Sequence, residues 1–281
     1  MSIIRKAGYG AGAILILVAG YVWYQSSHTE KDIMAFRKQV AEIAATAPAP
    51  LLDPDAFAGL PAPVKRYFDY TFNGPVDAYT VVRLEAAGNF RLPLTEDFNP
   101  TTAEQVIAIG TPALMFSATT PVFVGIPARA YDFFADGKME MKAKVLSAIT
   151  VVDESETEEL NRISIRRWLL ESPLYPQALL PGGPVTWEAI DDQSARAVVR
   201  AADLEASMLF FFNSQGQITH LAAEQDGDLT TPYHGSGEHV TRDDYRLVSN
   251  MMIPHQFTIS RAAGGEVFPF FKAEVTHIVY E

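Results

Sequence analysis

The stretch Ser155–Pro181, SETEELNRISIRRWLLESPLYPQALLP, decides the fold, because it is a long helical pattern in a region that otherwise reads as strands. Ser155 followed by Glu158 fits a capping box, in which each side chain satisfies a backbone N–H at the helix start. Glutamates near that start place negative charge at the positive end of the helix dipole. Pro173 ends the pattern. We therefore predict a helix over residues 156–172.

The helical wheel of this stretch has two apolar flanks. At about 100° per residue, a polar stripe with Arg167 and Glu171 runs between these flanks. A surface helix normally has a single apolar face. Two flanks therefore predict a helix that is covered on more than one side, such as one lying in the trough of a curved sheet. The flank residues are Leu160, Ile163 and Leu170 on one side, and Ile165, Trp168 and Leu169 on the other.

Composition and motifs exclude several classes of function. A net charge of -12 argues against a nucleic-acid partner, because phosphate binding needs a basic surface. The chain has no cysteine, which excludes disulfides, thiolate metal sites and a cysteine nucleophile. It also lacks a nucleophile elbow, a P-loop and a dinucleotide fingerprint. We predict no cofactor and no catalytic residue.

Residues 1–27 predict a membrane anchor. Arg5 and Lys6 precede the uncharged stretch Ala7–Tyr24, whose length is near the lower limit of about 18 residues for crossing a bilayer. Basic residues before the span place the N-terminus inside and the remaining chain outside. We thus expect a single-pass protein of the inner or cytoplasmic membrane with its C-terminal domain outside the cytoplasm. The alternative is a signal peptide cleaved near Val18-Ala19-Gly20.

The chain after the anchor divides into two parts. Residues 28–57 predict a juxtamembrane helix and linker, because Ile33 and Val40 share one face of a helix. Residues 58–281 predict one extracytoplasmic domain of about eleven strands, of which Met139–Val145 shows the clearest alternation. The fold class is mainly β with embedded helices (α+β), built on one strongly curved antiparallel sheet or half-barrel that wraps the central helix.

The most plausible ligand-binding residues lie on the central helix and on one apolar strand. Arg167 and Glu171 are four residues apart, a spacing that lets them form an ion pair. In the alternative hypothesis, Arg167 binds the anionic head group of a ligand. Trp168 would form part of an apolar wall, together with Phe210 and Phe212 from a strand that is apolar on both faces.

A metal site is a weaker hypothesis. His234 and His239 are separated by four residues, with Glu238 beside the second histidine. A zinc site would need a further ligand and a fixed geometry. Solvent-exposed loop histidines are the competing interpretation of this spacing.

Several motifs together resemble a known family. They are Leu60-Pro-Ala-Pro-Val-Lys-Arg-Tyr67, Arg167-Trp-Leu-Leu-Glu171 and Trp187-Glu-Ala-Ile-Asp191. In this order they resemble an uncharacterised bacterial family of membrane-anchored proteins, a domain of unknown function, over about residues 58–281. Trp168 stands where that family's helix motif is expected to have tyrosine. The resemblance implies no activity, but its strand pattern is similar to the half-barrel of bacterial lipoprotein carriers.

The leading hypothesis is a membrane-anchored protein that binds an apolar or lipid-like molecule between helix and sheet. The first alternative is a cell-envelope interaction module without a small ligand. The second is a hydrolase or a metal enzyme that uses His234, Glu238 and His239. The partners expected are therefore the membrane itself and a lipid or apolar small molecule. The sequence predicts no oligomeric state.

Overall fold

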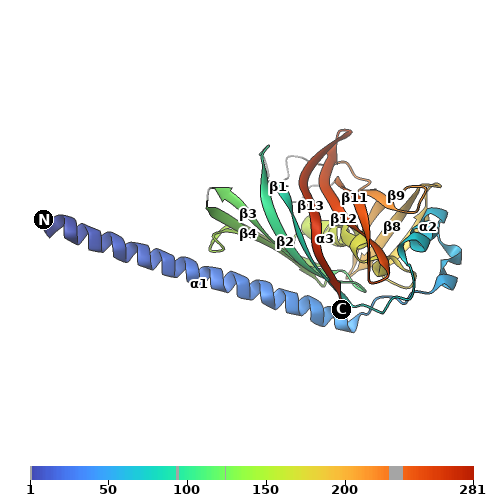
Figure 1. Cartoon of the computed structure of the whole chain (residues 1–281), viewed down its shortest axis with the longest axis horizontal. Helices are drawn as coiled ribbons and strands as arrows, with labels where there is room; N and C mark the ends of the chain where they lie inside the picture. Colours follow the sequence, from blue (N-terminus) through green and yellow to red (C-terminus); the bar gives the residue numbers. More distant parts are fainter. Residues whose placement is uncertain (1, 93–94, 124, 228–236) are drawn as a thin grey trace.

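The computed structural model of the chain describes residues 2–92, 95–123, 125–227 and 237–281, with side chains from residue 13 onward. Its main element is a strongly curved antiparallel sheet (Figure 1). The thirteen strands in the described residues exceed the predicted number of about eleven by two. They are β1 (Val81–Arg91), β2 (Phe98–Ala108), β3 (Ala113–Phe123), β4 (Ile126–Ala135), β5 (Lys138–Val145), β6 (Ile149–Ser155), β7 (Val185–Ala189), β8 (Ser194–Ala201), β9 (Leu204–Phe212), β10 (Ile218–Ala222), β11 (Glu238–Val248), β12 (Met251–Ala263) and β13 (Glu266–Tyr280).

The sheet consists of two meanders joined along one seam. The strand order is β6-β5-β4-β3-β2-β1-β13-β12-β11-β10-β9-β8-β7, and β1 pairs with β13 at the seam. The chain therefore completes one meander at β6, on one edge, and starts the next at β7, on the opposite edge. The segment between these strands has to cross the sheet. It does so as α3 (Glu158–Glu171), followed by the short 3-10 helices η2 (Ser172–Leu174) and η3 (Pro176–Leu179).

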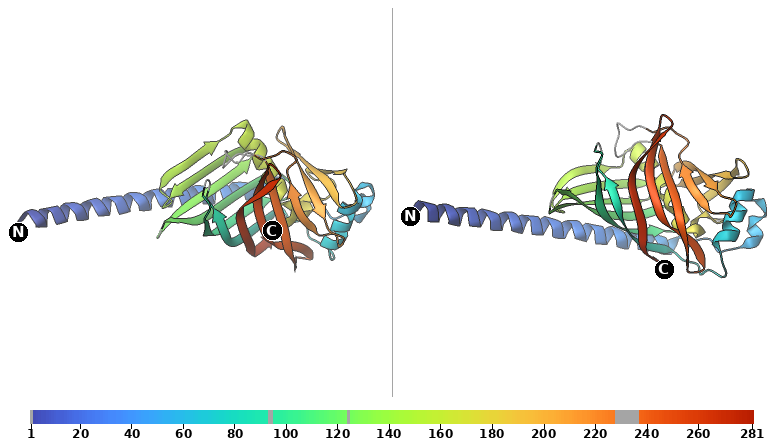
Figure 2. Two further views of the ribbon diagram at one scale, coloured as in Figure 1. Left: turned by 90° about the horizontal axis from the view of Figure 1, so that it is seen from above. Right: turned by 45° about the horizontal axis from the view of Figure 1, so that its top comes forward.

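The predicted position of the central helix in the trough of the sheet is confirmed. Most residues of both flanks are buried: Leu160 and Leu170 are 2% exposed and Trp168 is fully buried, whereas Ile163 is half-buried. The helix packs against β4 and β5 on one side and against β8 and β9 on the other. Figure 2 shows it enclosed by the curvature of the sheet.

The start of α3 differs from the prediction. Ser155 is the last residue of β6, so the predicted capping box with Glu158 is wrong. Thr157 is the N-cap instead, and its hydroxyl accepts a hydrogen bond from the backbone N–H of Leu160 at 3.1 Å. Strand pairing explains the shift, because Ser155 is held in register opposite Glu140 of β5.

A second layer covers the outer face of one meander. The helix α1 (Ser2–Thr46) runs without a break through the predicted anchor and juxtamembrane segments. Its C-terminal half packs Ile33, Val40 and Ala44 against an apolar cluster that includes Val106 of β2. Beyond the sheet, α1 projects freely on the side of β3 and β4 (Figure 1). The other helices in the described residues are η1 (Pro54–Gly59) and α2 (Ala62–Thr71).

Within the described part of the chain, no helix combines the length and the apolar character that crossing a bilayer requires. The span predicted from the sequence starts at Ala7, and the side chains of residues 7–12 lie outside the described ones.

Gly110 fixes the path of the chain after α1. An added Cβ would lie 2.2 Å from the carbonyl oxygen of Ala47 and 2.5 Å from that of Pro48. We expect Gly110→Ala to lower the free energy of unfolding by about 1–3 kcal/mol, the usual cost of overpacking. Chemical denaturation followed by tryptophan fluorescence measures this change. Gly59→Ala is the matched control, since among the described atoms none lies within 4 Å of its Cβ, and an equal loss in both variants would contradict the prediction.

Candidate functional site

The α3 helix presents three charged side chains to the inner face of the sheet. They are Arg166, Arg167 and Glu171, and each finds its partner on a strand, not on the helix itself. Charges in an apolar trough need such partners, because an unpaired buried charge is strongly unfavourable. The helix is thereby held to both meanders by polar contacts as well as by its apolar flanks.

Arg167 pairs with Asp132 of β4, so the predicted Arg167–Glu171 ion pair is wrong. Its guanidinium also lies over the ring of Phe116, 4.4 Å from the ring centroid. The i, i+4 spacing permits a pair along the helix, but the strand offers a carboxylate and an aromatic face together. Arg167 therefore already has a carboxylate partner on the sheet, and its contact with a ligand head group stays a prediction.

Glu171 belongs to a polar cluster with Arg242 of β11 and Gln105 of β2. One Glu171 carboxylate oxygen lies 3.5 Å from Arg242 Nη2, and the other lies 3.5 Å from Gln105 Nε2. Arg242 Nη2 also donates to the backbone carbonyl of Leu170 at 2.8 Å. The side chains of Arg242 and Glu171 are 0% and 2% exposed. The cluster joins both meanders to the C-terminal end of α3.

Three polar groups of this cluster remain unused. Arg242 Nε, Arg242 Nη1 and Gln105 Oε1 have no hydrogen-bond partner among the described residues. The neighbouring Tyr67 hydroxyl is also without a partner there, and burial raises the pKa of this phenol. A buried polar group normally finds a partner, and leaving it without one costs free energy. The cluster thus offers two N–H donors and one amide acceptor to a small polar group.

The predicted wall residues are all buried in one core cluster, but their ring partners differ. Trp168 donates from Nε1 to the carbonyl of Ala108 in β2 at 2.9 Å, and its ring lies 5.5 Å from that of Tyr175. Phe210 and Phe212 of β9 instead contact Trp187 of β7, with ring centroids 5.0 and 6.3 Å away.

Arg166 completes the polar contacts of α3. Its Nη1 lies 2.8 Å from Glu238 Oε2 of β11, and both side chains are at most 10% exposed. The Glu238 carboxylate that the sequence placed in a metal site is therefore committed to an ion pair.

The predicted metal site has little support in the described residues. His234 lies outside them. His239 stacks on His220 at a centroid distance of 5.5 Å, and His220 stacks on Phe211 at 4.1 Å. Burial lowers the pKa of both histidines. Within residues 2–92, 95–123, 125–227 and 237–281, no three His, Asp or Glu side chains are placed to hold a metal ion.

Residues 58–280 match a family of unknown function, DUF6920, which corresponds to nearly all of the predicted β-rich domain. The chain belongs to this family. The family resemblance predicted from the sequence is thus confirmed. None of the curated proteins matches this DUF6920 chain.

Three solved structures are similar to the DUF6920 chain. A LolA superfamily protein from Nitrosomonas europaea has 9% identity and a TM-score of 0.42, with 79% of this chain and 94% of that chain covered. A beta-barrel-like DUF1849 protein from Brucella abortus has 10% identity and a TM-score of 0.30, with coverage of 72% and 98%. A porin-like protein from Bacteroides uniformis has 8% identity and a TM-score of 0.26, with coverage of 75% and 99%.

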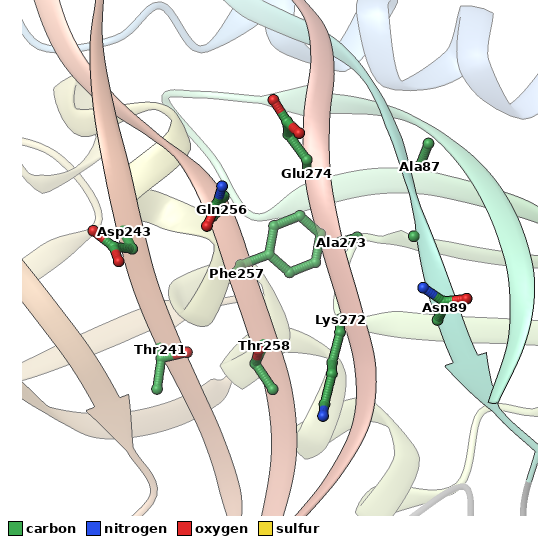
Figure 3. A pocket seen from close by; sticks show the side chains of 11 residues that line it. Ala87, Asn89, Thr241, Asp243, Gln256, Phe257, Thr258, Lys272, Ala273 and Glu274 are labelled. Atoms are coloured by element: carbon green, nitrogen blue, oxygen red, sulfur yellow. The ribbon is translucent and has the colours of Figure 1, made fainter. Parts of the chain in front are cut away.

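A groove of about 440 Å³ lies elsewhere on the DUF6920 chain, across β1, β13, β12 and β11 (Figure 3). Polar side chains such as Gln256, Lys272 and Glu274 line most of it. Exposed Gln256 and Lys272 alternate with buried Phe257 and Phe271, so these polar side chains point away from the core. An apolar ligand needs a mostly apolar lining, and none of the predicted site residues borders this groove.

Proposed function

We propose that this protein is a membrane-tethered, extracytoplasmic β domain that binds a lipid-like molecule between α3 and the sheet. The polar end of the molecule meets Arg242 and Gln105, and its apolar part lies among the apolar side chains of the trough. The observation that carries this proposal is the fully buried Arg242 guanidinium with two N–H groups unused within the described residues.

The tether is supported by the free part of α1. Ile14, Leu15, Ile16, Leu17 and Val18 are 54–73% exposed. Trp23 and Tyr24 follow them and are 73% and 55% exposed. A continuous apolar surface of this kind needs a lipid or protein environment, and aromatic residues at its end suit a membrane interface. Arg5 and Lys6 before it orient the chain with the C-terminal domain outside the cytoplasm, in the inner or cytoplasmic membrane.

The charges around Arg242 define the polar end of the ligand. Glu171 neutralises Arg242, so a fully charged phosphate would face a carboxylate as well as a guanidinium. A hydroxyl or amide group fits better, because it accepts from Arg242 and donates to Gln105 Oε1. The ligand class is therefore an amphipathic lipid whose polar end is uncharged.

Native mass spectrometry of the full chain, extracted from membranes in mild detergent and exchanged into fresh detergent, tests this proposal. The parent protein should retain one additional lipid-sized mass. The double variant Glu171→Gln with Arg242→Met should lose it, because the donor set is removed without leaving a buried charge unpaired. Arg246→Met is the control, since Arg246 lies on the same strand but is 46% exposed. A parent protein without bound mass, or a double variant with the same mass, would contradict lipid binding.

The burial of the α3 flanks favours a second candidate, an envelope interaction module without a small ligand. Ile165, Trp168 and Leu169 are 0% exposed and Leu160 is 2% exposed. In this alternative, α3 serves as a plug that holds the two meanders together. Its expected result is a parent protein that carries no additional mass and has a partner protein bound on its outer surface.

A further inference from the structure

One end of the sheet is fixed to the point where α1 leaves the domain. Thr29 of α1 is 0% exposed, and its hydroxyl lies 2.7 Å from the backbone carbonyl of Ser147, in the turn between β5 and β6. Lys144 donates from Nζ to the same hydroxyl at 3.0 Å. The next residue of α1, Glu30, pairs with Arg129 of β4 at 3.1 Å. The helix therefore departs beside the β5–β6 turn.

The same end of the sheet carries exposed apolar side chains. Phe123, the last residue of β3, is 73% exposed. Ile149 and Val151, at the start of β6, are 54% and 59% exposed. Antiparallel pairing places these segments together, since Ala128 of β4 pairs with Val145, and Val145 pairs with Ile149. We call Phe123, Ile149 and Val151 the apolar tip.

The apolar tip lies near the aromatic end of the exposed α1 surface. Tyr24 precedes Thr29 by five residues, which is about 7.5 Å of helix at about 1.5 Å per residue. The strand β4 extends two residues beyond Ala128 to reach Ile126, which pairs with Phe123; this adds at most about 7 Å. In the views of Figures 1 and 2, α1 extends away from the sheet on this side. A single membrane surface can therefore contact both the apolar tip and Tyr24.

A basic group lies just behind the tip. Within the ranges that the structure describes, Lys144 forms no ion pair, and its ammonium donates to the Thr29 hydroxyl. A lysine behind exposed aromatic and aliphatic side chains matches the layers of a membrane interface, where phosphates lie above the ends of the acyl chains. A protein partner would not require this order of apolar and basic groups relative to α1.

We propose that the apolar tip is a second membrane contact, which inserts into the interface of the same bilayer that α1 crosses. It rests on the proposed tether and adds a fixed orientation to it. The domain lies with the β3–β4 and β5–β6 ends against the lipid, and Lys144 meets lipid phosphates. The opposite end of the sheet, with Leu247, faces away from the membrane.

The absence of cysteine makes a clean experiment possible, since each introduced cysteine is the single labelling site. Full chains with Thr150→Cys, Ile16→Cys or Leu247→Cys are labelled with an environment-sensitive fluorophore. They are reconstituted into phosphatidylethanolamine and phosphatidylglycerol vesicles that contain lipids with a nitroxide quencher near the head group. For position 16 the nitroxide is placed at the end of an acyl chain, because the middle of the span lies far from both head-group layers. Thr150 is exposed between Ile149 and Val151, so this label leaves the apolar tip intact.

We expect the label at position 150 to be quenched several-fold more than the label at position 247. Adding Phe123→Asp to the Thr150→Cys chain should remove most of this difference, whereas adding Leu247→Asp should not. If position 16 is quenched and position 150 behaves like position 247, the tip contact is wrong and the tether stands. If position 16 is not quenched, the tether is wrong and the tip contact falls with it.

Discussion

Arg242→Met is expected to lower the free energy of unfolding by about 3–5 kcal/mol, the range seen when one partner of a buried ion pair is removed. The substitution leaves Glu171, whose side chain is 2% exposed, without its guanidinium partner. It also removes the donor to the Leu170 carbonyl near the end of α3. Chemical denaturation of the purified full chain measures the change, and Arg246→Met on the same strand should cost less than about 1 kcal/mol.

The double variant Glu171→Gln with Arg242→Met separates the two contributions to this loss. With the carboxylate replaced by an amide, no charge remains buried, and a pair replaced by groups of similar shape is often nearly neutral. Most of the lost stability should therefore return. If the double variant is as unstable as Arg242→Met alone, the loss comes from packing around Phe257, over which Arg242 lies at 5.4 Å.

The sequence predicts which α3 side chains are internal but not their partners. The wheel places Arg167 and Glu171 on one stripe, and the simplest inference pairs them. In the structure, Asp132 and Arg242 take these roles from strands that are 35 and 71 positions away along the chain. Such partners depend on strand register and on the order of strands in the sheet, which a single sequence does not contain.

The sequence around Arg242 contains a strand pattern that indicates burial of this side chain. In the strand Glu238–Val248, Val240 and Arg242 share one face, and Val240 is fully buried. Side chains on one face of a strand recur every two residues. An arginine two positions from a buried valine therefore lies on the buried face, which indicates an internal charge. The sequence prediction did not include Arg242, since its partner Glu171 lies on a distant helix. Gln105 follows the same rule on β2, two residues before the buried Ile107.

The sequence predicts the general architecture better than it predicts the β1–β13 seam and the number of strands. Two apolar flanks on one helix and alternating strands around it predict a sheet that wraps the helix, as observed. The pairing of β1 with β13 is a contact between the two ends of the domain. Nothing local encodes it except Gly88, where an added Cβ would lie 2.1 Å from the Lys272 carbonyl oxygen. Close approach of two backbones is one of the reasons for glycine in a strand.

Trp168→Ala shows whether Trp168 is a core residue or lines a ligand-binding site. If the indole is part of the core, its loss creates a cavity and removes the hydrogen bond to Ala108, and the free energy of unfolding falls by about 3–5 kcal/mol. Trp168→Phe keeps most of the volume and should lose clearly less. Thermal or chemical denaturation of the ligand-free protein makes the comparison.

The same variant has a different result if Trp168 borders a bound lipid. The wall of a binding site is only partly supported by protein, so its truncation enlarges the site and costs little stability in the ligand-free protein. The mass retained in native mass spectrometry would then shift toward larger lipids, while the unfolding curve stays near that of the parent. Full burial of Trp168 and its bond to β2 favour the core role. The ligand then lies toward Arg242 and Gln105, at the C-terminal end of α3, and Trp168→Ala should leave the identity of the retained lipid unchanged.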